Sequence, residues 1–157
     1  MDKNEAVITF LMQCPTIQQN PLFFNFADEK DGNNHFITHT DTLKKPYIDG
    51  SLLKTYTFTI ACYKSMSHLA LAGTSDFGDE NIENLALVQE ILDWLNTQSY
   101  DRHYPDFGEG YVIESMETLS NDPKLDGVDN SVNPPLARYS IGVQIEYLDN
   151  TKKLWNS

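Results

Sequence analysis

Basic residues are scarce in this sequence. Its 157 residues include 11 Lys and Arg against 23 Asp and Glu, which gives a formal net charge of −12 at pH 7. Proteins that grip nucleic acid gain affinity by releasing counterions through Lys and Arg, so this imbalance disfavours a DNA- or RNA-binding function. An acidic surface would still let DNA slide past without sticking, although solubility is the simpler explanation of the charge taken alone.

Cysteine is nearly absent as well. Cys14 and Cys62 form neither a CxxC motif nor a zinc-finger spacing with histidine, which excludes a disulfide framework. Cys62 lies in the alternating run TYTFTIACYK and shares a face with Tyr56, Phe58 and Ile60. We therefore expect Cys62 to be a small buried residue.

Long apolar runs are missing too. No stretch approaches the roughly 18 apolar residues that a membrane-spanning helix needs. The first residues, MDKNEAVITFLMQ, carry acidic side chains and run into Pro15, unlike the basic start and cleavage region of a signal peptide. We expect a soluble, cytoplasmic protein with no membrane partner.

Motifs for cofactors and metals are not found. There is no phosphate-binding loop, and FGEG at 107–110 lacks the third glycine of a dinucleotide-binding turn. His35 and His39 would lie roughly 13 Å apart on a strand, too far for one zinc ion. The segment 122–130 lacks the calcium-loop register. We expect no cofactor and no metal.

A catalytic group is not singled out either. Ser67, His68 and Asp76 lie near one another, but without a nucleophile elbow. Apolar neighbours would raise the pKa of the Cys62 thiol, and none of the many carboxylates stands out as a pair. The sequence therefore predicts a protein that is not an enzyme. A small hydrolase acting through His68 or His103 stays open as an alternative.

What the sequence does contain is a single globular domain. With 40% hydrophobic residues, a chain of this length buries roughly 70% of its unfolded surface. The pattern of elements extends over residues 3–149, and the polar segment 150–157 follows as a tail. We expect one domain over 1–157.

Two helices are predicted. Asp2 and Glu5 form a capping pair for a helix that continues to Pro15, which disfavours helical backbone before it. Asp79 caps a second helix over 80–98, with Glu80 in the first turn, where the helix dipole favours negative charge. Apolar residues recur at helical spacing in both, at Val7, Phe10, Leu11 and Cys14 and at Ile82, Leu85, Val88, Leu92 and Leu95.

Strands are predicted on both sides of the second helix. Segments 22–27 and 35–41 read as a hairpin around the Asp31-Gly32 turn, and alternation marks a strand over 53–64. After the helix, 110–120 and 138–149 are strands. In the last of these, apolar residues at every second position alternate with polar ones: Tyr139, Ile141, Val143, Ile145 and Tyr147 face the core.

The segments between these elements are predicted to be irregular. Residues 41–54 form a polar loop or the tip of an extended arm, 65–80 a linker, and 121–136 a long polar loop. The order of elements indicates an α+β fold, with a mostly antiparallel sheet, two main helices on one face and an extended hairpin or arm loop.

One surface segment stands out by its charge. Lys44, Lys45 and Lys54 lie with Tyr47 and Asp49 in LKKPYIDGSLLK, within an otherwise acidic chain. A basic, aromatic loop on an acidic body suits head-to-tail contact between identical subunits. We predict an interface with another protein subunit at these five residues; an ordinary solvated loop is the competing interpretation.

Four blocks of the sequence carry a resemblance: YIDGSLLKTYTFTI, ENIENLALVQEILDWL, YPDFGEGYVIES and NPPLARYSIGVQIEYLD. Together they resemble the tail terminator or tail completion (minor capsid) proteins of long-tailed phages of Gram-positive bacteria, over most of residues 3–149. The linker at 65–80 is long for this family.

The resemblance implies an α+β subunit without an active site. Such subunits form a ring, typically a hexamer, that caps the tail tube, stops its growth and joins it to the head. The implied partners are further copies of the chain, the tail tube protein, the head-completion protein and passing DNA. The implied location is the head–tail junction of the virion, with the host cytoplasm during assembly.

Two other functions stay open beside the hydrolase. A head-completion or stopper protein would act at the same junction. A ligand-binding domain would instead use the Tyr-rich face of the sheet.

Overall fold

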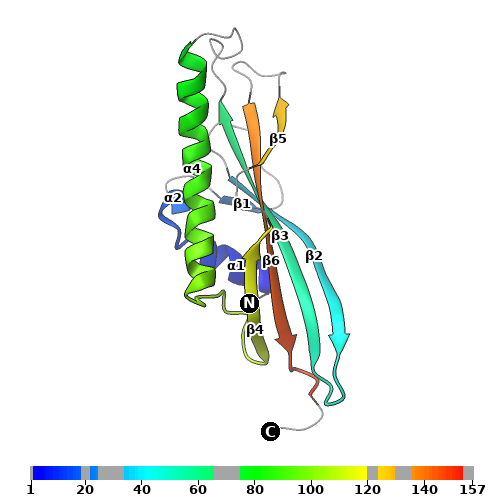
Figure 1. Cartoon of the computed structure of the whole chain (residues 1–157). Coiled ribbons are helices and arrows are strands. Elements are labelled where there is room, and N and C mark those ends of the chain that lie inside the picture. Colours follow the sequence, from blue (N-terminus) through cyan, green and yellow to red (C-terminus); the bar gives the residue numbers. More distant parts are fainter. Residues whose placement is uncertain are drawn as a thin grey trace.

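The computed structural model describes residues 2–18, 22–24, 34–65, 75–119, 124–129 and 136–153. In chain order, the elements are α1 (Lys3–Leu11), α2 (Pro15–Gln18), β1 (Leu22–Phe24), β2 (Asn34–Pro46), β3 (Leu52–Ser65), α4 (Ser75–Tyr100), β4 (Tyr111–Thr118), β5 (Lys124–Asp129) and β6 (Leu136–Asp149). Figure 1 shows the helices on one side of a long twisted sheet. Within the described part of the chain, no helix is both long and apolar enough to cross a membrane.

The sheet is mostly antiparallel, and the predicted α+β class is confirmed. Its strands follow the order β1-β2-β3-β6-β4, with β5 also paired to β6. β3 and β6 pair along their whole length, from Leu52↔Asp149 to Ser65↔Leu136. β4 and β5 share the other side of β6, β4 along its second half and β5 along its first.

The core lies between the helices and one face of β3 and β6. The predicted alternation is confirmed, because every inward residue of β6 from Tyr139 to Tyr147 is buried. These side chains share one core with the two helices, whose buried members are Ala6, Val7, Phe10 and Leu11 in α1 and Val88, Ile91, Leu92 and Leu95 in α4. Cys14 and Cys62 are both buried and neither forms a disulfide, and the burial of Cys62 is as expected.

The start of α1 is as predicted, but its end is not. Asp2 caps the helix, with its carboxylate accepting a 2.8 Å hydrogen bond from the Glu5 amide. The helix ends at Leu11 and not at Pro15, which instead opens α2. Proline is favoured at the first position of a helix because its missing N–H would have no partner there.

The long helix begins earlier than predicted. Ser75 opens α4, so Asp79 lies inside the helix and does not cap it, and residues 75–80 of the predicted linker 65–80 are helical. Gly78 lies within this helix, since a glycine costs a helix interior only about 1 kcal/mol. The residues 66–74 of that linker lie outside the described part.

The predicted hairpin of 22–27 with 35–41 is wrong. β1 has three residues and pairs parallel to β2, from Leu22↔Asn34 to Phe24↔Phe36. A tight turn joins antiparallel strands only, so a local Asp-Gly signal could not have made this pair. Asp31 and Gly32 themselves lie outside the described residues.

The predicted loop at 41–54 is mainly strand. β2 runs to Pro46 and β3 starts at Leu52, so only 47–51 form the turn. The alternative of an extended arm is the one that holds, since this hairpin reaches beyond the lower end of α4 in Figure 1. Register shifts interrupt β2 between Thr38 and Thr40 and between Leu43 and Lys45. The part of the arm at 40–46 is exposed, so it lacks the apolar alternation by which a strand is recognised.

The predicted loop at 121–136 contains a strand as well. β5 (Lys124–Asp129) pairs with β6 from Lys124↔Ser140 to Asp129↔Leu136, with a register shift between Leu125 and Gly127. The register shift interrupts the alternation of inward and outward residues by which a strand is recognised. The charged residues of β5 leave few apolar positions to reveal the alternation that remains. β4 and β6 lie where 110–120 and 138–149 were predicted, to within two residues.

Candidate subunit interface at the hairpin tip

The turn at the tip of the β2–β3 arm is closed by its own hydrogen bonds. The Tyr47 amide donates to the Ser51 carbonyl at 2.9 Å. One carboxylate oxygen of Asp49 accepts from the Ser51 amide at 2.9 Å and from its hydroxyl at 2.6 Å. These bonds lower the pKa of Asp49. Gly50 takes φ +91°, which non-glycine residues rarely adopt. The tip is therefore an ordered turn.

The five predicted interface residues do come together at this tip, but the lysines are occupied. Lys44 pairs with Glu146, and the Lys54 ammonium lies 2.9 Å from a carboxylate oxygen of Asp149. The Lys45 ammonium sits 5.4 Å from the centre of the Tyr47 ring. Their charge is thus largely engaged within one subunit, and the sequence alone did not foresee these partners.

Asp149 is a buried acid that the sequence reading placed in no role. It is 6% exposed, and its second carboxylate oxygen accepts bonds from the Thr151 amide at 3.0 Å and hydroxyl at 2.5 Å. Burial alone would raise its pKa, but the Thr151 and Lys54 bonds outweigh burial and hold the pKa at about 2. The hydrogen bond between Lys54 and Asp149 raises the pKa of Lys54. The pair fastens the start of β3 to the end of β6.

A second network ties the arm to α1. The Tyr147 hydroxyl donates to Asp41 at 2.6 Å, and the Lys3 ammonium lies 3.3 Å from the other oxygen of Asp41. Lys3 also sits over the rings of Tyr111 and Tyr147, at 4.9 and 5.4 Å from their centres. Burial, and then the Asp41 bond, raise the pKa of Tyr147. The arm is thereby braced against the body.

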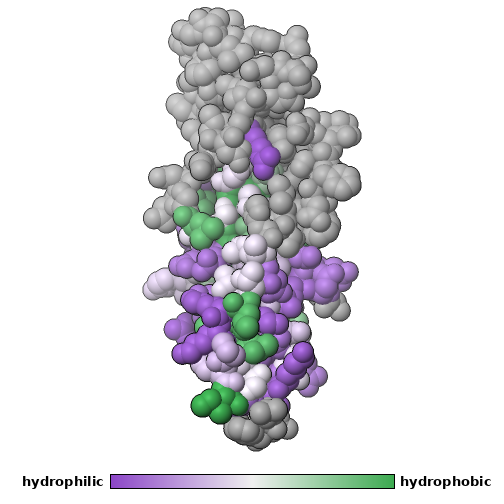
Figure 2. All heavy atoms as spheres, turned by 90° about the vertical axis from the view of Figure 1, so that its right-hand side faces the viewer, coloured by the Kyte–Doolittle hydropathy of each residue, from purple (hydrophilic) through white to green (hydrophobic). Residues whose placement is uncertain are grey.

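An open groove of about 780 Å³ lies on the other side of the sheet. It is lined by Tyr47, Ile48, Asp49, Ser51, Leu53, Glu114, Glu146 and Leu148. Leu53 and Leu148 are cross-strand partners, and they face away from the helices because their neighbour Tyr147 is buried on the helix side. Figure 2 shows this helix-free face, with hydrophobic side chains gathered near its lower end among hydrophilic ones.

The groove has an apolar floor and an acidic rim. Ile48 is 92% exposed beside it, and Tyr47 is 40% exposed. The sequence feature that could have predicted the groove is the pair Leu53 and Leu148, since each leucine interrupts an otherwise polar strand face. The position of Glu114 beside the groove could not be predicted from strand alternation, because Glu114 lies at a register shift in β4.

Of the histidines considered for chemistry, His103 is the one whose side chain the structure describes. His103 is exposed, and its Nδ1 lies 2.6 Å from the side-chain oxygen of Gln98. It borders a hollow of about 360 Å³ lined otherwise by Ala6, Thr9, Phe10, Gln13, Tyr104, Pro105 and Asp106. Ser67 and His68 lie outside the described residues, and so do the side chains of Asp76, His35 and His39. Among the described residues, no three His, Cys, Asp or Glu side chains are grouped so that they could hold a metal ion.

The chain matches no protein-family model, and no curated protein matches it significantly. The likeness to phage tail terminators therefore stays a hypothesis that depends on the four sequence blocks. The groove at the tip of the arm is a separate observation, which does not depend on that likeness.

Proposed function

We propose that this chain is a non-enzymatic assembly protein: a tail terminator that forms a ring on the end of a phage tail tube, with six copies as the resemblance implies. The ring stops tube growth and joins tail to head. The observation that carries the proposal is the apolar groove at the tip of the arm, beside the 92% exposed Ile48. Exposed apolar surface with a polar rim is typical of protein–protein contact sites.

The bracing of the arm supports an assembly role. In the described part of the chain, four ion pairs fix it: Lys44 with Glu146, Lys54 with Asp149, Lys3 with Asp41, and Lys153 with Asp49. A surface that is already held in its bound shape loses less conformational freedom on association. The groove is therefore presented to a partner in one orientation.

The charge supports a place beside DNA. A net charge of −12 repels the phosphate backbone, so a ring of such subunits would let DNA pass without holding it. In this proposal the arm and its groove meet other protein subunits, while the acidic remainder faces solvent or the channel.

Size measurement tests the proposal. The purified chain is run on a sizing column with light scattering at low and high concentration, and is then mixed with tail tubes and imaged. We expect rings, either free or on tube ends. Ile48→Asp should prevent them, whereas Leu87→Asp, at a 37% exposed leucine on α4, serves as the matched control. A chain that stays monomeric and leaves tubes uncapped would contradict the proposal.

A head-completion protein is the alternative within the same class. After tail detachment, a labelled antibody would mark the head side of the joint for that protein and the tail side for a terminator. The ligand-binding alternative is less well supported, because Tyr56, Tyr139 and Tyr147 on the Tyr-rich face of the sheet are buried in the core.

A further inference from the structure

We propose that the corner after α4, formed by Tyr100 and Arg102, inserts into the hairpin-tip groove of the next copy of this chain. This inference rests on the proposed ring and names its subunit contact. Tyr100 is 88% exposed, and the Arg102 guanidinium makes no ion pair or hydrogen bond with the part of the chain that the structure describes. Tyrosine and arginine are among the residue types that are enriched at the energetic centre of protein interfaces.

The backbone at this corner is one that favours glycine. The Arg102 amide donates to the Ser99 carbonyl at 3.2 Å, and the His103 amide to the Gln98 carbonyl at 2.8 Å. This pair of bonds is the Schellman motif, which places the residue after the helix cap in the left-handed region. Arg102 takes φ +57° and is the one non-glycine residue with positive φ in the described part. An arginine at a backbone position that favours glycine supports the hypothesis that its side chain has a function.

The groove offers what this corner needs. Its floor of Leu53 and Leu148 suits an aromatic ring, and its rim carries three acids. Glu146 is already paired with Lys44, and Asp49 accepts from Ser51. Glu114 is exposed and has no ion-pair partner among the described residues. It is therefore the carboxylate open to an incoming guanidinium, which pairs with carboxylates in a fixed, two-pronged geometry.

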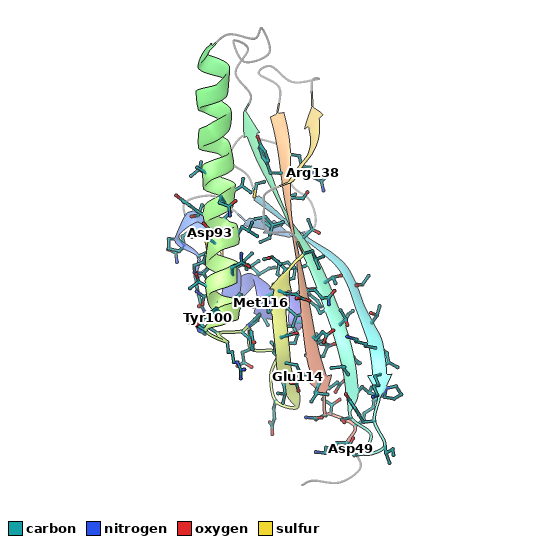
Figure 3. All side chains as sticks on the ribbon, viewed as in Figure 1. Asp49, Asp93, Tyr100, Glu114, Met116 and Arg138 are labelled. Atoms are coloured by element: carbon teal, nitrogen blue, oxygen red, sulfur yellow. The ribbon has the colours of Figure 1, made fainter. Side chains whose placement is uncertain are left out.

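The corner and the groove lie apart on one molecule. Figure 3 places Tyr100 at the lower end of α4, in the helix layer, with Glu114 on β4 and Asp49 at the tip of the arm. A contact between two different surfaces is repeated from copy to copy, and it closes into a ring when the rotation allows. A docking of corner into groove therefore generates the assembly that the proposed function requires.

Charge reversal tests this contact in the full chain. Arg102→Glu places two acids opposite each other at every junction, and Glu114→Arg places two bases there. Each should raise the concentration for half-assembly at least about tenfold. The double variant, and an equimolar mixture of the two single variants, restore opposite charges at every junction and should assemble like the wild type. Asp93→Arg on α4, with the same charge change as Glu114→Arg, is the control and should assemble normally.

Arg102→Gly separates this role from a structural one. Glycine fits the left-handed backbone, so the melting temperature should rise while assembly weakens. Assembly equal to the wild type in Arg102→Gly, or in both charge reversals, would overturn the inference and leave the proposed ring intact. If the wild type itself never forms rings, even on tail tubes, the proposed function fails first.

Discussion

Lys54 and Asp149 form a largely buried ion pair, with 2.9 Å between the ammonium nitrogen and a carboxylate oxygen. The two residues lie 95 positions apart in the chain and join the start of β3, next to the tip of the arm, to the end of β6. Because Asp149 also receives two bonds from Thr151, its charged form is favoured in the folded state. The pair is therefore a structural fastening whose strength depends on pH.

Replacing Asp149 with Asn should lower the free energy of unfolding at pH 7 by about 1–2 kcal/mol, because hydrogen bonds to a charged group are lost. The folded-state pKa of about 2 lies below the ordinary value of 3.8, so the carboxylate stabilises the fold above pH 4. That stabilisation is lost as the pH falls from 4 towards 2. Urea unfolding of the wild type and of Asp149→Asn at pH 7 and pH 3 measures this loss. A difference in unfolding free energy between the two proteins that does not shrink at pH 3 would contradict the low pKa of Asp149.

Both cysteines should be unreactive in the folded protein. Cys14 is 1% exposed and Cys62 0%, and a thiol reagent must contact the sulfur to modify it. We expect no thiol to be titrated by Ellman's reagent in native buffer and both to be titrated in urea. Rapid labelling of either residue without denaturant would show that its part of the core opens.

Replacing Gly50 with Ala should weaken the tip. Its φ of +91° is strained for any residue with a Cβ, by roughly 1 kcal/mol. Hydrogen exchange at the amides of Tyr47 and Ser51 should speed up, since their bonds close the turn. Assembly should weaken in parallel, because the same turn lines the groove. Unchanged exchange at both amides would argue against this local effect.

Charge reversal at Lys44 and Lys45 should weaken assembly more at low salt than at high salt. Lys44→Glu would face Glu146, with which the native lysine pairs, and the arm would become acidic on an already acidic chain. Exposed charges are screened within about 10 Å at 0.1 M salt, so the defect should fade as salt is added. Light scattering across a salt series measures it; an equal defect at every concentration would exclude an electrostatic role for the arm.

The fold was predictable where one face of an element touches the core. Alternation in β6 and the Asp2 cap of α1 were read directly from the residues, because burial and capping act locally. The arm and β5 were missed for the opposite reason: the described arm residues at 40–46 are exposed, and β5 carries charges and an irregular register. The parallel pairing of β1 depends on how the chain returns to the sheet, which no short motif encodes.

The candidate site was only partly predictable. Its location at the tip followed from the basic, aromatic segment 44–54. The pairing of Lys44 with Glu146 and of Lys54 with Asp149 did not, since both acids come from the far end of the chain. The exposed corner at Arg102 gave no sequence signal. A left-handed arginine is visible only once the backbone is known.

The edge of β2 has a consequence for how copies can meet. β1 covers only its first three residues, from Asn34 to Phe36, and the rest has no other strand beside it on that side in the described part. Two bulges, two lysines and a terminal proline make this edge a poor template for another strand. In the proposed assembly, copies would therefore meet through side chains and not by adding strands to one another's sheets at this edge.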